Sequence, residues 1–363
     1  SFPTRRSSDL YGDILMPEIQ FADVAEYRRK KQMKGSFSPL LYREMKQVLE
    51  EGKQVILFQN RRGYSAYMQC DACGATLKCD HCDVSMTYYK QRDILSCRYC
   101  GSIKKPEELC GECGKGHYRL RTPGTEKIEE EVVRLFPGVR VARMDMEAMN
   151  SRAKYQSVID DFEQGKTQVL VGTQMVSKGL DFENVKLVGV MDADSMVNFP
   201  DFRAEERAYE MLMQVSGRSG RKGQRGLVVI QTADLQNRIY KLLFRQDYAT
   251  FYAELAEERQ NFAYPPFCRL ISVEIRHKEV VALRSMANQL ASRLREQLGK
   301  RVCGPAVPEV GRIGGMYRLQ IIIKIEQGAS FSKVKAFLKQ ELAGLQKGKG
   351  FSGFRMICDV DPG

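Results

Sequence analysis

Residues 70–113 read CDACGATLKCDHCDVSMTYYKQRDILSCRYCGSIKKPEELCGEC and place eight cysteines, as four C-x-x-C pairs, within 44 residues. Two chemistries compete for such a block, a disulfide framework and a metal site. A chain of 363 residues can bury cores without covalent cross-links, and its first residues, SFPTRRSSDL, contain no apolar run typical of a secretion signal. We therefore expect a protein of a reduced compartment, where cysteine pairs at this spacing bind metal rather than one another.

The spacing of the pairs predicts two zinc ions, because two C-x-x-C turns complete one tetrahedral four-thiolate site. Five, fourteen and nine residues separate successive pairs, and the fourteen-residue segment suits a β-hairpin that returns the third pair beside the second. This favours a nested arrangement with an inner set, Cys79, Cys82, Cys97 and Cys100, and an outer set, Cys70, Cys73, Cys110 and Cys113. Sequential pairing, first with second and third with fourth, is the alternative. A site of four cysteines has no open coordination position, so we expect a structural role.

Apolar runs of strand length alternate with amphipathic segments on both sides of the cysteine block. Strands are predicted at 54–58, 139–144, 168–173, 185–192 and 226–232. Helices are predicted at 39–51 with Ser38 as N-cap, at 125–136 with Thr125 as N-cap, at 151–164 and at 201–215. Strands without polar alternation, separated by helices, indicate a parallel sheet with helices on both faces. The cysteine block is then an insertion into one α/β domain.

The remaining segments divide the chain further. Residues 1–34 are predicted as an irregular connector, and the first ten, rich in Ser and Arg, are treated as a non-native or misread end. The α/β domain takes 35–69 and 114–235, the metal module 70–113, and a helical linker 236–269. Residues 270–363 follow the order βαββαβ, which predicts an α+β domain with a split βαβ sandwich. Three isolated cysteines are expected to be buried apolar residues: Cys268, Cys303 and Cys358.

The net charge of +12, from 57 Lys and Arg against 45 Asp and Glu, favours a polyanionic partner. Nucleic acid ranks before a membrane because no basic amphipathic helix stands out and the longest apolar runs have strand length. A solvated basic surface without a partner is the alternative. We expect a cytoplasmic protein.

Phosphate chemistry is indicated by QVSGRSGRKGQRG at 214–226, where glycines allow close backbone approach and Arg218 and Arg221 supply forks that match phosphate oxygens. A solvated Gly/Arg loop is the alternative. The sequence contains no G-x-x-x-x-G-K-[ST] motif that would cradle a nucleotide. The α/β domain therefore has the features of one half of a two-lobed motor. Without a P-loop before them, Asp192 and Asp194 in MDAD are expected to be structural.

The combination of several motifs resembles one family. GTQMVSKGLDF at 172–182 is followed by NFPDFRAEERAYEMLMQVSGRSGR at 198–221, and the cysteine block lies between VILFQNRRGY at 55–64 and GTEK at 124–127. This pattern is similar to the PriA family, primosomal protein N-prime, of replication-restart DNA helicases, and it covers nearly all of the chain from about Tyr11. The resemblance implies a RecA-like second helicase lobe with an inserted zinc module and a carboxyl-terminal α+β domain.

By this resemblance the chain is part of a superfamily 2, ATP-dependent 3′-to-5′ DNA helicase. The last helicase motif implies catalytic roles near ATP and Mg²⁺ for Gln214, Arg218 and Arg221. The preceding motif implies nucleotide contacts by Gly179 and Asp181. The candidates for DNA contacts are Arg61, Arg62, Thr173, Gln174, Lys178 and Thr125.

The resemblance also implies partners and a dependence on sequence outside this chain. Forked and single-stranded DNA, primosome proteins and single-strand-binding protein are the expected partners, in recognition of abandoned forks and the start of primosome assembly. The phosphate-binding Lys and the Mg²⁺-binding acidic motif belong to a first lobe that the sequence does not contain, so we expect the chain alone to be inactive. The alternative is a non-enzymatic, zinc-dependent scaffold that binds nucleic acid or protein.

Overall fold

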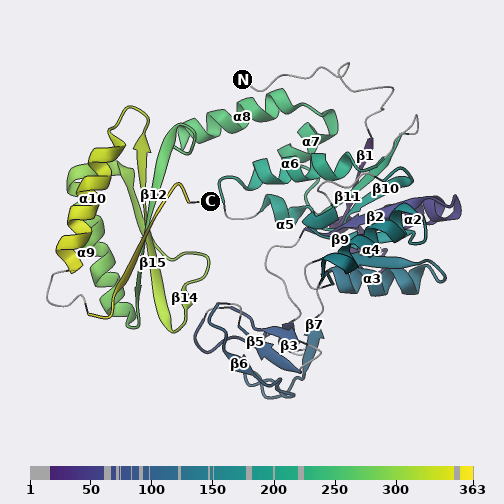
Figure 1. Cartoon of the computed structure of the whole chain (residues 1–363), viewed down its shortest axis with the longest axis horizontal. Helices are drawn as coiled ribbons and strands as arrows, with labels where there is room; N and C mark the ends of the chain where they lie inside the picture. Colours follow the sequence, from purple (N-terminus) through teal and green to yellow (C-terminus); the bar gives the residue numbers. More distant parts are fainter. Residues whose placement is uncertain are drawn as a thin grey trace. The chain divides into compact units, whose positions relative to one another are not determined.

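The computed structural model describes residues 17–60, 67–70, 73, 75–82, 84–89, 93–97, 99–121, 124–145, 148–149, 151–176, 182–198, 201–219, 225–346 and 352–362. The chain forms two compact units, each of which is described by itself (Figure 1). The first unit is drawn from residues up to 64 and from 122–253, and the second from 65–121 and from 254 onward. No helix in the described part of the chain is long and apolar enough to cross a membrane.

The first unit is built on a six-stranded sheet in which every neighbouring pair runs parallel. In spatial order its strands are β1 (Glu18–Asp23), β11 (Leu227–Thr232), β10 (Val185–Val190), β2 (Gln54–Phe58), β9 (Val169–Gly172) and β8 (Val141–Met144). The helices of this unit are α1 (Val24–Arg29), α2 (Pro39–Glu50), α3 (Gly124–Leu135), α4 (Arg152–Glu163), α5 (Asp194–Val197), α6 (Ala204–Ser216), α7 (Arg238–Arg245) and the first residues of α8 (Tyr248–Asn261), with a 3-10 turn η2 (Gln174–Val176).

Burial on both faces of the sheet explains the unbroken apolar strands. Val55 and Leu57 of β2 pack in one cluster with side chains of α2 and α3. Ile56 and Phe58 alternate to the opposite face and are equally buried. The predicted parallel sheet between helices is confirmed.

The amino-terminal segment differs from its prediction. Residues expected as an irregular connector form β1 and α1, with Ile19 and Ala22 buried and the Asp23 carboxylate accepting the Glu26 N–H at 2.8 Å as the helix cap. The prediction of irregular structure is wrong here because β1 is an edge strand, whose order comes from pairing with β11 late in the domain. Its short mixed sequence, EIQFAD, carries little periodicity to reveal that pairing.

The cysteine block folds as two small antiparallel sheets between β2 and α3. β3 (Tyr67–Cys70) pairs with β7 (Tyr118–Arg121), and a second sheet contains β4 (Thr87–Tyr89), β5 (Ile94–Ser96) and β6 (Ile103–Lys104). The β4–β5 hairpin lies within the fourteen-residue spacer between the second and third cysteine pairs, as predicted. Residues 67–121 are called the zinc module below.

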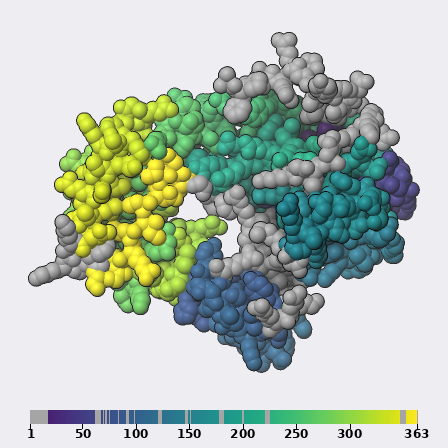
Figure 2. Space-filling view, viewed as in Figure 1, coloured from purple at the N-terminus to yellow at the C-terminus, as the bar shows by residue number. Residues whose placement is uncertain are grey.

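The carboxyl-terminal domain is a four-stranded antiparallel sheet with two long helices. Its elements are β12 (Cys268–His277), α9 (Val280–Leu298), η3 (Gly299–Arg301), β13 (Val302–Ala306), β14 (Arg312–Ile313), β15 (Met316–Glu326), α10 (Phe331–Gln346) and β16 (Arg355–Val360). The sheet order β13-β15-β12-β16 confirms the predicted split βαβ sandwich, to which β14 adds a short hairpin on β15. The zinc module contacts the turn of this hairpin within the second unit (Figure 2).

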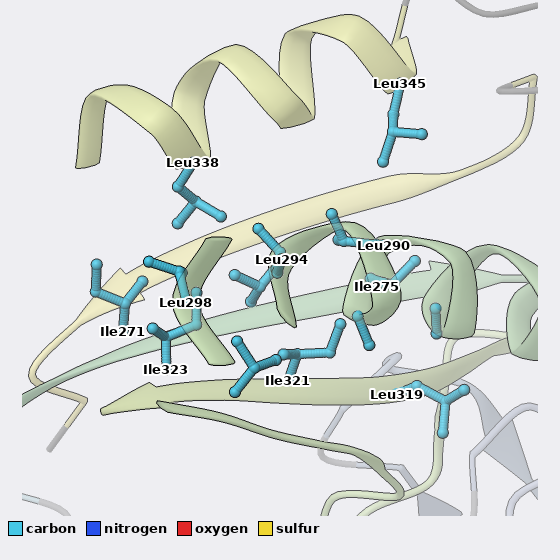
Figure 3. Close-up of a cluster of buried hydrophobic side chains, with 14 of the residues drawn as sticks. Ile271, Ile275, Leu290, Leu294, Leu298, Leu319, Ile321, Ile323, Leu338 and Leu345 are labelled. Carbon is cyan, nitrogen blue, oxygen red and sulfur yellow. The ribbon is translucent and has the colours of Figure 1, made fainter. Parts of the chain in front are cut away.

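The core of this domain lies between the helices and one face of the sheet (Figure 3). Ile275 and Ile321 point from the strands toward Leu290 and Leu294 of α9, and Ile271 lies beside Leu298. The alternate residues of β12 face the other way, and among them Glu274 accepts hydrogen bonds from Arg318 at 2.5 and 2.9 Å and from Arg276. Burial raises the pKa of the Glu274 carboxyl, but these guanidinium hydrogen bonds outweigh it and hold the pKa below its usual range.

Replacing Glu274 with Gln tests this ion pair. A carboxylate whose pKa is lowered by folding stabilises the fold above its unfolded pKa, and the contribution is lost as the pH falls through the folded pKa. Glu274→Gln should therefore lower the free energy of unfolding by about 1–3 kcal/mol at pH 7. The difference from wild type should shrink as the pH falls through the lowered pKa of the Glu274 carboxyl. Urea unfolding between pH 7 and pH 3 measures both effects.

The matched control is Glu279→Gln, an exposed carboxylate at the start of α9 whose side chain makes no capping hydrogen bond. This variant should unfold like the wild type at pH 7. Equal destabilisation by the two substitutions would contradict a specific role for the Glu274 pair.

Candidate functional site

The carboxyl ends of the parallel strands carry the first group of candidate residues. Thr173 follows β9 directly, its N–H donates to the Met144 carbonyl of β8 at 3.3 Å, and η2 begins at Gln174. Gly172 is required at this bend, because a Cβ there would lie 2.3 Å from Val176 Cγ1 and 2.8 Å from the Met144 oxygen. The close approach of β8, β9 and η2 therefore positions Thr173 and Gln174, both half-buried, at the sheet edge.

Gln214 and Arg218 lie at the end of α6. Gln214 is in the last turn of the helix, and Arg218 follows Gly217 with its backbone N–H bonded to the Val215 carbonyl at 3.0 Å. The helix is anchored by buried residues that include Tyr209, whose ring stacks on Phe251 with centroids 4.3 Å apart. Gln214 is exposed and Arg218 is half-buried, and both lie at the ordered end of α6.

Six candidate residues lie outside the part of the chain that the structure describes. They are Arg61, Arg62, Lys178, Gly179, Asp181 and Arg221. Their proposed roles remain predictions.

Thr125 does not fit the expected contact with DNA. Its side chain is 1% exposed, and its hydroxyl donates to Asp145 Oδ2 at 2.8 Å. The expected capping role is also wrong, because α3 begins at Gly124 and Thr125 lies within its first turn. The hydroxyl is therefore buried and hydrogen-bonded inside the domain. Helix capping patterns do not reveal this, because it results from tertiary packing.

The structure adds an electrostatic network at the end of β8 that sequence reasoning missed. Asp145 Oδ2 lies 3.2 Å from Arg143 Nε, and Asp145 Oδ1 accepts the Ala148 N–H at 2.8 Å. Glu126 and Glu129 of α3 lie within 3.9 Å of the same guanidinium, and burial raises the pKa of Glu129. The sequence feature that could have indicated this network is the position of Asp145 directly after a predicted strand.

Asp192 and Asp194 of the MDAD segment accept hydrogen bonds from neighbouring elements of the first unit. Asp194 accepts from the Tyr240 hydroxyl at 2.9 Å and from the Ala233 N–H at 2.6 Å, while Asp192 accepts from the Ser195 N–H at 3.2 Å. Their partners tie α5 to the end of β11 and to α7. This agrees with the structural role expected for them.

The eight cysteines of the zinc module form two sets of converging thiols. The outer set is Cys70, Cys73, Cys110 and Cys113, and the inner set is Cys79, Cys82, Cys97 and Cys100. The sets are therefore nested, and the sequential alternative does not apply. The sulfurs of Cys70 and Cys113, and those of Cys73 and Cys110, are 3.7 Å apart, and those of Cys79 and Cys100 are 3.6 Å apart.

These sulfur separations fit a tetrahedral zinc ion. Four thiolates at a Zn–S distance of about 2.3 Å stand about 3.8 Å from one another. The three separations match that geometry, and the sulfurs of each set all lie within 4.8 Å of one another. The sets pack with apolar side chains such as Met86 and Leu95. Residues and spacing thus suit two closed, structural metal sites.

A metal requires deprotonated thiols, and neighbouring hydroxyl groups lower the pKa of one thiol in each set. The Tyr118 hydroxyl lies 3.5 Å from Cys110 Sγ and lowers the pKa of that thiol to about 6. In the inner set, the Ser102 hydroxyl lies 3.4 Å from Cys100 Sγ and likewise lowers its pKa to about 6. At least one thiol of each set thus has a lowered pKa, whereas the pKa of Cys73 in the outer set and that of Cys82 in the inner set are raised to about 12.

Of the three isolated cysteines, Cys268 is buried as expected, whereas Cys303 and Cys358 are exposed. The prediction of burial is wrong for these two because they lie on β13 and β16, the two edge strands of the carboxyl-terminal sheet.

Models of three protein families match the chain. The helicase conserved C-terminal domain matches residues 119–223, the PriA DNA helicase Cys-rich region matches 79–105, and the primosomal protein N C-terminal domain matches 260–363. The three matches fall on the parallel-sheet unit, the zinc module and the carboxyl-terminal domain described above.

Curated relatives with the name replication restart protein PriA align over most of the chain. The protein of Bacillus subtilis is 37% identical over 90% of this chain and 40% of its own length. Those of Haemophilus influenzae and Treponema pallidum are 35% and 38% identical over 93% and 95% of this chain, and 46% and 51% of their own lengths. The chain thus spans about half the length of these relatives. Its alignments and its three domain matches agree, and the chain belongs to the PriA family of replication restart proteins.

Proposed function

We propose that this chain supplies the second helicase lobe, the zinc module and the carboxyl-terminal domain of an ATP-dependent 3′-to-5′ DNA helicase that restarts replication at abandoned forks in the cytoplasm. The observation that carries the proposal is the insertion of two nested four-cysteine sets between β2 and α3 of a helicase-type lobe. Primosome proteins and single-strand-binding protein are the partners that family membership suggests.

The proposed ATP site is shared with a first lobe, because this sequence contains no P-loop. Arg218 and Arg221 would stabilise the charge that develops on the γ-phosphoryl group during its transfer to water. Gln214, one helical turn before Arg218, would help to position the nucleotide, and Gly179 and Asp181 would line the same site. The ordered end of α6 supports this role, since a fixed backbone reduces the entropy cost of placing a guanidinium.

The proposed path for DNA follows the carboxyl ends of β2 and β9. Thr173 and Gln174 are held there by the Gly172 bend, and Lys178, Arg61 and Arg62 would add positive charge for backbone phosphates. The net charge of +12 supports a polyanionic ligand.

Zinc is proposed for both four-cysteine sets, with the thiolates as its four ligands in each. Bound zinc would hold a module that has little apolar core of its own, a contribution on the order of 10 kcal/mol. The closed ligand sets support a structural role, in which the module presents a rigid surface to DNA or to a protein partner.

Arg218→Ala tests the ATP site in a protein that carries this chain behind a first helicase lobe. Loss of the guanidinium should lower DNA-stimulated ATP turnover by about 10³-fold or more, because no other group replaces its charge in the transition state. A phosphate-release assay measures the rate. The control is Arg245→Ala, an exposed arginine at the end of α7, which should keep wild-type turnover.

Turnover by this chain without a first lobe would refute the shared site. If the two-lobed protein binds DNA but hydrolyses no ATP, the non-enzymatic scaffold replaces the helicase proposal.

Metal analysis tests the two sites. The wild-type chain should contain two zinc ions, and Cys97→Ser and Cys113→Ser should each lose one, because each removes a ligand from a different set. Inductively coupled plasma mass spectrometry gives the count. Cys303→Ser, at an exposed isolated thiol, should retain both ions. A wild-type count of one ion would rule out paired sites.

Salt dependence tests the DNA contacts. Affinity for single-stranded DNA should fall steeply with salt, and Lys178→Ala should reduce the slope of log K against log salt by about one. Fluorescence anisotropy across a salt series measures this slope. Lys46→Ala, at an exposed position on α2, is the charge-matched control and should leave the slope unchanged. A flat wild-type response would point to a protein partner instead.

A further inference from the structure

The turn of the β14–β15 hairpin makes a specific contact with the inner cysteine set. The Gly314 N–H donates to Cys82 Sγ at 3.1 Å, and the Gly315 N–H donates to the His81 carbonyl at 2.7 Å. Ile313 packs against the apolar cluster of the zinc module. Two successive backbone donors of the carboxyl-terminal domain thus engage successive residues of one C-x-x-C turn.

The geometry of the hairpin turn suits this contact. Gly314 and Gly315 have φ of +57° and +77°, the pair of positive values that a two-residue type I′ turn requires. No atom lies within 4 Å of a Cβ placed on either glycine. The glycines are therefore needed for backbone conformation, while the space beside them remains open to small side chains.

The two cysteine sets differ in where their sulfur hydrogen bonds originate. In the outer set, Cys70 Sγ accepts from the Cys73 N–H at 3.5 Å and Cys113 Sγ from the Gly116 N–H at 3.4 Å, both within the zinc module. In the inner set, Cys79 Sγ accepts from the His81 N–H at 3.4 Å. The donor that the structure describes for Cys82 Sγ is Gly314, which comes from a different domain.

Metal binding and domain docking are linked through this bond. A metal-bound cysteine is a thiolate, and a hydrogen bond to a charged acceptor is about twice as strong as a neutral one. Metal in the inner set therefore strengthens the bond from Gly314. By thermodynamic reciprocity, the docked turn must strengthen retention of that same metal ion.

We propose that metal occupancy of the inner set, and not of the outer set, docks the carboxyl-terminal domain onto the zinc module through the β14–β15 turn. The inference rests on the zinc binding proposed above and adds a role for one of the two ions. The inner metal acts as a positioning element between the zinc module and the carboxyl-terminal domain.

Hydrogen exchange of the Gly314 and Gly315 amides tests the first half of this linkage. The variants are Cys97→Ser in the inner set and Cys113→Ser in the outer set, neither of which accepts a hydrogen bond from the turn. Exchange should be about tenfold faster or more in Cys97→Ser. It should stay within about twofold of wild type in Cys113→Ser. Equal behaviour of the two variants, whether fast or slow, overturns the proposal.

The zinc content of the same samples separates this inference from the metal proposal. If the wild-type chain contains no zinc, the proposal of two metal sites is itself contradicted. If the wild type holds two ions, Cys97→Ser holds one, and amide exchange at the turn is unchanged, the metal sites stand and only the proposed coupling is contradicted.

Zinc release to a chelator tests the reciprocal half. Gly314→Pro removes the donor N–H together with the positive φ that presents it, because the proline ring holds φ at about −65°. Gly314→Asn keeps the N–H, and asparagine is the residue after glycine that best tolerates positive φ. One of the two ions should leave Gly314→Pro about tenfold faster than it leaves the wild type, and the other should leave at the wild-type rate. Gly314→Asn should release both ions at the wild-type rate. Protected β15 amides verify that the sheet of each variant is intact. Wild-type release of both ions from Gly314→Pro overturns the linkage.

Discussion

Parallel pairing of β2 on both of its edges is the constraint on which the first unit depends. All five residues of QVILF are buried, and β2 lies between β10 and β9. Because the sheet is parallel, the carboxyl ends of β2, β9 and β8 meet at one edge, where Thr173 and Asp145 follow their strands. That edge is where both the candidate DNA contacts and the zinc insertion arise.

The insertion leaves this sheet intact because its two ends are close together. A Cβ on Gly124, the first residue of α3, would lie 3.1 Å from Gln59 Cγ just after β2. The β3–β7 pair then begins and ends the module, and the outer cysteine set links Cys70 on β3 to the last C-x-x-C pair of the block. The nested cysteine sets thus join the first and last segments of the module, so that its two ends lie side by side and fit between adjacent chain ends of the sheet domain.

Hydrophobic periodicity and residue spacing predicted the helices and strands that are determined by residues close in sequence. The helix capped by Ser38, the five predicted strands of the parallel sheet and the split βαβ order follow from residues close in sequence. The predictions of structure and burial were wrong at positions where contacts between residues far apart in sequence determine the conformation. Edge strand β1 gains its order from β11, and Thr125 is buried because its hydroxyl meets Asp145 after the next strand. Exposed Cys303 and Cys358 lie on edge strands, a position that composition alone does not reveal.

The sequence by itself determined the chemistry of the cysteine block, since four C-x-x-C pairs can supply eight thiolates for two ions in any fold. The fourteen-residue spacer favoured the nested order, and sequential pairing stayed open as the alternative. Only the tertiary structure decided this, because the β4–β5 hairpin returns Cys97 and Cys100 to Cys79 and Cys82. The tertiary structure also brought Gly314 to Cys82, a pairing 232 residues apart that depends on the carboxyl-terminal domain packing against the zinc module. Local spacing sets which groups can bind a metal, whereas long-range packing sets which backbone donors reach them.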